Sequence, residues 1–255
     1  MNTTNFYIPK NIYSAFLALT TPALSTYNFI TKNASLITRE LNGDKDAIGL
    51  IPSCELINNK NIFVSSKIAI SFDGPLSNSY FYFKPNQKEL SKIFLRGDVT
   101  LNEVLLSKIL FTELYSTNPE FIIDTKQKLS DVDNYIIAGN ENLDSRVFGK
   151  GMSLSDEIAE LIDYPYVNFV VASYNQEKIE KLNKAMLNLD EIVEENLDKI
   201  LKKIDLSNNI ETFVRDNIDS VYFELTENEV DGLKELIKQL YYHGLIEDLF
   251  EISFV

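Results

Sequence analysis

The chain has 255 residues and a net charge of −14, and 45% of its residues are hydrophobic. This length and apolar content suit one large domain or two lobes with packed cores, and they exclude a chain that is disordered overall. The acidic balance argues against binding to nucleic acid or to an anionic membrane, since both favour basic faces. Binding of a small anionic ligand is still compatible with this charge, because local amides and hydroxyls would hold such a ligand in a closed pocket.

Missing sequence features indicate where the protein is located and argue against some kinds of metal site. No run reaches the ~18 apolar residues of a membrane span, and no basic segment precedes an apolar stretch near the start, so we expect a cytoplasmic protein. Cys54 is the only cysteine and His243 the only histidine, which argues against a disulfide and a zinc site. Cys54 is expected to be a small buried hydrophobe, with a nucleophilic role as the alternative. His243 is expected at a helix C-terminus, before Gly244.

Short runs rich in β-branched and aromatic residues predict seven strands. They lie at residues 5–8, 47–51, 67–71, 80–84, 92–96, 134–139 and 168–174. Helical periodicity between the runs predicts helices at residues 35–43, 101–114 and 153–163. Strands that alternate with helices favour an α/β fold with mostly parallel sheets.

The last third of the chain is predominantly helical. Residues 176–204 are heavily charged, and their Glu/Lys spacing supports exposed i,i+4 pairs; a coiled coil is the alternative. A further helix is expected after Thr226, because Glu229 stands three residues on and completes a capping box.

Two lobes are expected, although no linker is visible in the sequence. The runs at 80–84 and 168–174 flank a central α/β block, as strands crossing between two lobes at a hinge would. We therefore expect a discontinuous lobe of residues 1–83 and 173–255, and a second lobe of residues 84–172.

Several sequence blocks share their order and spacing with those of a known family. The blocks are ELNGDKDAIGLIPSCEL, FDGPLSNSYFYFK, NYIIAGNENL, SLSDEIAELIDYPYVNFVVA and VYFELTENEVDGLKELIKQLYYHGLI. In that order they resemble the menaquinone-biosynthesis family typified by chorismate dehydratase, over roughly residues 30 to 246. The resemblance implies a two-lobed, type II periplasmic-binding-protein-like fold with a cleft between the lobes.

The polar residues that follow the run at 47–51 fit such a cleft. Ligands of these folds bind at the carboxyl ends of parallel strands, so Ser53 and Glu55 are expected to face the space between the lobes. Alternatively, Pro52 turns the chain and Ser53 caps a short helix.

The implied reaction is loss of water from chorismate, giving 3-(enolpyruvyl-oxy)benzoate in the futalosine route to menaquinone, with no cofactor or metal. Neutral donors at helix N-termini hold carboxylates well, and the sequence offers such donors at the positions of the family motifs. The implied substrate-binding residues are Lys10, Tyr13, Ser53, Ser77, Asn78, Ser79, Thr100, Asn102 and Asn140. An ordinary cap or turn role is the alternative at the motif positions.

Elimination also needs a proton removed and a hydroxyl helped to leave. Candidates for this catalytic work are Asn11, Glu55 and Glu103, with Glu141 as a further acid near a motif. Each acid alone is better explained as a solvated surface group. A substrate carboxylate is an alternative base, in which case the protein supplies orientation and excludes water.

The sequence departs from the family pattern at the presumed site. Asn11 stands one place away from the family's site asparagine, beside Lys10, and TLNE replaces an SRTS turn, so an arginine is lost and Glu103 is gained. A glutamate near a carboxylate ligand repels it unless the glutamate is paired or protonated. Two family tryptophans are Ile158 and Leu161 here, which are conservative packing changes.

Three hypotheses stay open. The first is a divergent chorismate dehydratase, or a relative that acts later in the same pathway on a dehypoxanthine futalosine-like substrate. The second is a non-catalytic binding protein or sensor for a small polar or carboxylate ligand, as a monomer or homodimer. The third is an interaction protein with a vestigial cleft. Glu103 discriminates between them: if its carboxylate points into the cleft with no cation such as Lys10 nearby, chorismate is disfavoured as ligand.

Overall fold

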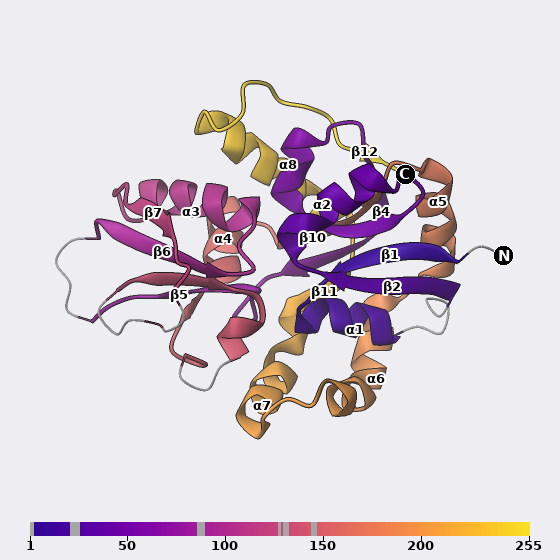
Figure 1. Cartoon of the computed structure of the whole chain (residues 1–255), viewed down its shortest axis with the longest axis horizontal. Coiled ribbons are helices and arrows are strands. Elements are labelled where there is room, and N and C mark those ends of the chain that lie inside the picture. The colour runs from indigo at the N-terminus through magenta and orange to yellow at the C-terminus, as the bar shows by residue number, and fades with distance from the viewer. Residues whose placement is uncertain (1–2, 21–25, 86–89, 127–128, 130–132, 144–146) are drawn as a thin grey trace.

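The fold consists of two β-sheets with flanking helices, and each sheet is the centre of one lobe (Figure 1). The computed structural model describes residues 3–20, 26–85, 90–126, 129, 133–143 and 147–255. The α/β, two-lobed architecture expected from the sequence is confirmed.

The larger lobe contains a mixed sheet in the order β11-β4-β10-β3-β1-β2, with β12 beside β4. Its strands are β1 (Thr4–Pro9), β2 (Tyr27–Lys32), β3 (Ile48–Pro52), β4 (Phe63–Phe72), β10 (Tyr166–Ser173), β11 (Val221–Glu224) and β12 (Ser253–Phe254). Its helices are α1 (Ile12–Thr20), α2 (Ala34–Gly43), the 3₁₀ helix η2 (Ser53–Asn58), α5 (Gln176–Ala185), α6 (Leu189–Ile204), α7 (Asn208–Asn217), the 3₁₀ helix η4 (Ile218–Ser220) and α8 (Glu227–Tyr242). In Figure 1, α1, α6 and α7 lie below this sheet, and α2 and α8 lie above it.

The smaller lobe contains a five-stranded sheet in the order β7-β6-β8-β5-β9. Its strands are β5 (Ser79–Tyr82), β6 (Lys92–Gly97), β7 (Glu120–Ile123), β8 (Tyr135–Ala138) and β9 (Met152–Ser153). Its helices are α3 (Leu101–Glu113), α4 (Leu154–Ile162) and the 3₁₀ helix η3 (Gly139–Leu143).

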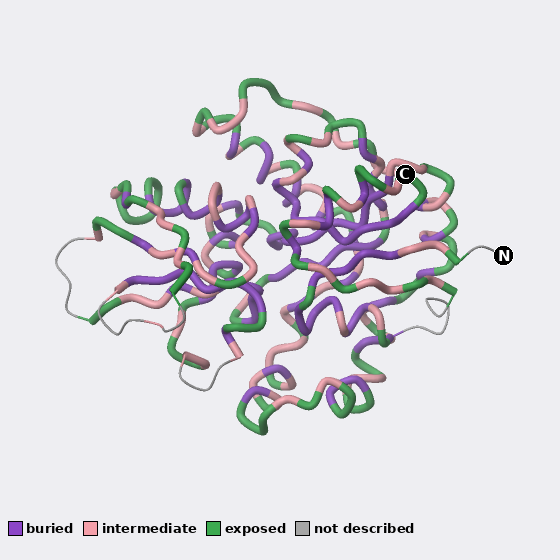
Figure 2. Tube along the Cα trace, viewed as in Figure 1, coloured by how far each residue is buried: buried purple, intermediate pink, exposed green. Residues whose placement is uncertain are grey.

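The central strands of the larger sheet are covered on both faces. Every residue of β3 and of β10 is buried, which explains why their sequences are continuous apolar runs rather than alternating ones (Figure 2). The sheets are mixed rather than mostly parallel, because β10 runs antiparallel to both β3 and β4. The sequence of a strand that is buried on both faces does not show whether the strand pairs parallel or antiparallel with its neighbours.

The lobe boundaries expected at 83/84 and 172/173 are corrected by strand pairing. β5 pairs with β8 and β9 in the smaller sheet, and β10 pairs with β3 and β4 in the larger one. The chain therefore crosses between lobes at residues 73–78 and again at residues 163–165. The run at 168–174 is apolar because it is the centre of a sheet, and not because it spans a hinge.

The charged segment at 176–204 forms two helices, α5 and α6. They are separated at Asn188, whose φ of 55° is a left-handed conformation that asparagine tolerates better than most residues. Their buried residues, among them Ile179 and Val193, join the core of the larger lobe. The apolar side of each helix therefore faces this chain's own core rather than a coiled-coil partner.

Buried apolar packing also joins the lobes on one side. A single cluster contains Leu56 of η2, Leu106 and Ile109 of α3, and Leu233 of α8. This packing gives the lobes a common base, next to the segments through which the chain crosses.

Substitution of Gly97 by alanine is expected to destabilise the protein. Gly97 has a φ of 86° at the end of β6, and an added Cβ would lie 2.1 Å from the carbonyl oxygen of Ala138. Because that obstacle is backbone, we expect Gly97→Ala to lower the free energy of unfolding by roughly 2–4 kcal/mol. Urea unfolding measures this change.

Gly43→Ala is the matched control, because a Cβ at Gly43 of α2 would meet nothing within 4 Å. We expect this control to lose no stability and to gain up to about 1 kcal/mol. Two variants with the same stability would contradict the strained close approach at Gly97.

Candidate functional site

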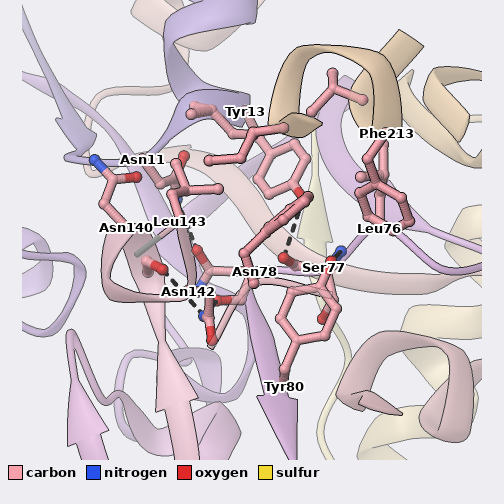
Figure 3. A pocket seen from close by; sticks show the side chains of 15 residues that line it. Asn11, Tyr13, Leu76, Ser77, Asn78, Tyr80, Asn140, Asn142, Leu143 and Phe213 are labelled. Atoms are coloured by element: carbon pink, nitrogen blue, oxygen red, sulfur yellow. Dashed lines mark hydrogen bonds between the residues drawn. The ribbon is translucent and has the colours of Figure 1, made fainter. Parts of the chain in front are cut away.

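A small enclosed chamber lies between the lobes, where the N-terminus of α1 meets the 73–78 segment, η3 and α7 (Figure 3). Its lining residues are Asn11, Ile12, Tyr13, Leu76, Ser77, Asn78, Tyr80, Gly139, Asn140, Asn142, Leu143, Phe148, Ile210, Phe213 and Val214. Its volume of about 20 Å³ holds a single water molecule. A larger ligand therefore requires the lobes to move apart.

Two buried asparagines form the polar centre of this chamber. Asn11 caps α1, because its Oδ1 accepts the backbone N–H of Ser14 at 2.8 Å. Its Nδ2 donates to Oδ1 of Asn78 at 3.1 Å. The backbone oxygen of Asn78 in turn accepts the N–H of Gly139 at 2.7 Å. The pair thus connects α1 of the larger lobe with η3 of the smaller lobe.

The two asparagines of η3 differ in their freedom to bind a ligand. Asn142 is buried and occupied, since its Nδ2 donates to the carbonyl of Ile137 at 2.7 Å and its Oδ1 accepts from the hydroxyl of Tyr82 at 3.0 Å. Asn140 is exposed, and among the described residues its side-chain amide has no hydrogen-bond partner. Asn140 is therefore the more available of the two.

The hydroxyl groups at the chamber stay neutral. Tyr13 donates to the backbone oxygen of Ser77 at 3.0 Å, and Tyr80 donates to that of Pro75 at 3.0 Å. Burial raises the pKa of both tyrosines. These two are the only titratable residues in the chamber lining, which offers uncharged donors and acceptors.

The opposite wall of the chamber is apolar. Phe213 of α7 and Leu76 lie on one side in Figure 3, and Asn11 and Asn140 lie on the other. The ring of Phe213 meets that of Phe148 edge-to-face, with centroids 5.5 Å apart. Because Phe148 precedes β9 of the smaller lobe and Phe213 belongs to the larger lobe, this contact closes the chamber from both lobes.

An open groove of about 490 Å³, within the size range of small-ligand sites, shares Asn140 with the chamber. Its lining includes Lys10, Arg96 and Asp98. The guanidinium of Arg96 is already paired, with Glu141 at 2.6 Å and Asp124 at 3.2 Å. Lys10 is exposed, and in the described part of the chain no carboxylate pairs with its ammonium group, so it is freer than Arg96 to meet a ligand.

The lobes are tied together at the fully buried side chain of Asn102. Its Oδ1 accepts the N–H of Cys54 at 2.9 Å and the hydroxyl of Ser53 at 3.4 Å, and its Nδ2 donates to the carbonyl of Asn168 at 2.8 Å. Ser53 and Asn102 thus contact each other across the lobe junction, and both are closed to a ligand in this structure.

Glu103 follows Asn102 in α3, but its hydrogen bonds stay within the smaller lobe and it lines neither cavity. One carboxylate oxygen accepts the backbone N–H and the hydroxyl of Thr100, each at 2.7 Å, and the other accepts the hydroxyl of Ser79 at 2.6 Å. The pair forms the capping box of α3, and Glu103 has 0% exposure. With both oxygens occupied and buried, Glu103 is not placed to act as a base.

Glu55, two residues after Ser53, lies outside both cavities. It is half-buried in η2 and lines neither the chamber nor the groove, and burial raises its pKa. The structure thus gathers part of the predicted set at the cavities. Those residues are Lys10, Asn11, Tyr13, Ser77, Asn78 and Asn140. Of the remainder, Ser53 and Asn102 join the two lobes. Ser79, Thr100 and Glu103 bond to one another and brace the smaller lobe.

Sequence reasoning missed several lining residues. Asn142 stands two residues after Asn140, so the GNENL segment offered a signal for it. Asp98 lies just after a predicted strand, in the segment RGDVT. Ligands of such folds bind at the carboxyl ends of strands, so this position was a signal for a site residue. No sequence motif marks Phe148 or Phe213 as a lining residue, because the two side chains come together only in the folded chain.

The described residues contain no cluster of possible metal ligands, and the thiol of Cys54 is buried. No group of three or more His, Cys, Asp or Glu side chains within them is arranged to hold a metal ion. No helix in the described part of the chain is long and apolar enough to cross a membrane. Cys54 is buried, and desolvation raises the pKa of its thiol. His243 caps the C-terminus of α8, the position expected from the sequence.

Solved structures share this fold over nearly the whole chain. Protein AF1704 from Archaeoglobus fulgidus superposes with a TM-score of 0.72 at 16% identity, over 96% of this chain and 98% of its own. The periplasmic aliphatic sulphonate binding protein SsuA from Escherichia coli gives a TM-score of 0.64 at 11% identity, over 99% and 96%.

The Candida albicans CA3427 gene product, described as having the generic periplasmic binding protein fold, gives a TM-score of 0.57 at 11% identity, over 98% of this chain and 92% of its own. No family model and no curated protein sequence matches the chain. The likenesses establish the periplasmic-binding-protein fold that the sequence led us to expect, and at these identities they establish the fold alone.

Glu103→Ala is expected to act on stability, because it leaves the N–H and hydroxyl of Thr100 and the hydroxyl of Ser79 without their acceptor. Unsatisfied buried donors cost about 1–3 kcal/mol each, so we expect a loss of roughly 2–5 kcal/mol in urea unfolding.

Glu229→Ala is the matched control, since Glu229 forms the same capping box with Thr226 on α8 but braces no second strand. Its loss should be close to that of an ordinary cap, about 1 kcal/mol. An equal or smaller loss for Glu103→Ala would contradict the bracing role.

Proposed function

We propose that the cleft binds a small carboxylate-bearing molecule, with its acid group held at the chamber by neutral donors. The observation that carries the proposal is the Asn11–Asn78 pair, which brings side chains from both sides of the cleft together at the N-terminus of α1. An acid group seated there would touch both lobes, so its binding would favour closure.

The chemistry of the chamber suits an anion better than a cation. The α1 N-terminus carries the positive end of the helix dipole, and the lining contains no carboxylate that would repel an acid group. Among the described residues, nothing accepts a hydrogen bond from Nδ2 of Asn78 or of Asn140, so both amides are free to donate. Such bonds offset the cost of removing a carboxylate from water.

The apolar wall and the structural neighbours support the same class of ligand. Leu76 and Phe213 would cover the non-polar part of a small molecule whose polar groups face the asparagines. Structures of this fold from Escherichia coli and Xanthomonas axonopodis are by name sulphonate-binding proteins, so the fold accommodates small anions elsewhere.

Dehydration of chorismate is the second candidate function. It is favoured by the position of Asn11 and Asn78, which the family resemblance placed at the site and which meet at the chamber. The lining supplies no acid or amine as base, so in this mechanism a carboxylate of the substrate takes the proton. The C–H electron pair then forms the new double bond as the C–O bond breaks, and the departing hydroxide takes the proton from the carboxyl group and leaves as water. The protein orients the substrate and excludes solvent.

The test is incubation of the purified chain with chorismate, followed by thermal shift and by product mass. A saturable rise in Tm supports binding, and a product lighter by one water adds the dehydratase activity. Asn78→Ala should weaken binding roughly tenfold or more, because it removes a hydrogen bond to a charged group.

Asn28→Ala is the control, since Asn28 is exposed on β2 and bonds only to Asn5 among the described residues. Binding without turnover would leave a binding protein. If chorismate gives no shift, a panel of carboxylates and sulfonates follows, and a ligand that binds equally well to wild type and Asn78→Ala would overturn the chamber as its site.

A further inference from the structure

Helix α2 of the larger lobe is capped by a residue of the smaller lobe. The N-cap residue Asn33 makes no side-chain capping bond. Instead, the first helical N–H, that of Ala34, donates to Oδ2 of Asp98 at 2.7 Å. A helix N-terminus favours a carboxylate, and here that carboxylate comes from across the cleft.

Asp98 is held in place by its own lobe. It follows Gly97, whose φ is 86°, and its backbone N–H donates to the carbonyl of Ala138 at 3.1 Å. Gly139 leaves room for it, because a Cβ at Gly139 would come within 3.3 Å of the Asp98 Cβ. The carboxylate therefore moves with β6 and β8, and a separation of the lobes must break its bond to Ala34.

The contact is built to be released, unlike the junction at Asn102. Every polar atom of the Asn102 side chain has a buried partner. Asp98, by contrast, lies at the rim of the open groove, and its Oδ1 is buried with no hydrogen-bond partner in the described part of the chain. Opening would return that oxygen to water, and this gain offsets much of the bond that is lost.

We infer that Asp98 is a latch that keeps the two lobes closed in the absence of ligand and must release before a ligand can enter the chamber. The lobes turn about the junction at Asn102, where packing is continuous, and part at the groove. The closed chamber holds only one water molecule, so a residue that keeps it closed controls access to it.

The test compares wild type with Asp98→Ala by amide hydrogen exchange and small-angle X-ray scattering, both in the absence of ligand. Exchange of the Ala34 N–H should become roughly tenfold to a hundredfold faster, the factor for losing a bond to a charged acceptor. The radius of gyration should increase as the lobes part. Asp98→Asn keeps an acceptor oxygen in a side chain of the same size, so it should show both changes to a smaller degree.

Asp46→Ala is the matched control. It removes the same charge from a carboxylate whose side-chain bond, to Nδ2 of Asn175, stays within the larger lobe. We expect this control to match wild type in both measurements. Faster exchange at Ala34 with an unchanged radius of gyration in both Asp98 variants would reduce Asp98 to a helix cap and overturn the latch.

Discussion

The buried side chain of Asn102 sets the relation between the two lobes. From α3 it reaches the start of η2 at Cys54 and the middle of β10 at Asn168, with 0% exposure. Loss of that side chain would leave a buried N–H and a buried C=O unpaired, which is why one amide can fix the position of one lobe relative to the other. The chamber and the groove form beside this fixed junction, so their geometry depends on it.

Much of the fold could be predicted from local sequence, and the connections between strands could not. The strands β1, β3, β4 and β6 follow β-branched and aromatic runs that predict them directly. The sequence of β10 does not show whether the strand pairs parallel or antiparallel, or which sheet it joins. A strand buried on both faces is a continuous apolar run whatever its neighbours. Helix α1 was missed because it is apolar almost all round and offers no clear periodicity.

The site divides in a similar way. Order and spacing of sequence blocks were enough to select Asn78 and Asn140. Asn11 was selected from a segment that departs from the family motif by one position, and it lines the same chamber. Order and spacing were not enough to separate ligand-facing residues from bracing ones: Thr100 and Glu103 carry the same T-x-x-E capping pattern that was recognised at Thr226, yet they were assigned to the site. Because Glu103 is engaged by Thr100 and Ser79 within the smaller lobe, the chamber is neutral. It is suited to holding an anion and, for chemistry, to a substrate that supplies its own base.

The most direct test of the account is an NMR titration of the side-chain amide resonances of Asn11, Asn78 and Asn140 with chorismate and related small carboxylates. The account predicts that a ligand which binds shifts these resonances together, saturably and with one dissociation constant. A ligand that binds tightly and shifts amides elsewhere, with these three unchanged, would contradict the claim that the chamber between the lobes is the site.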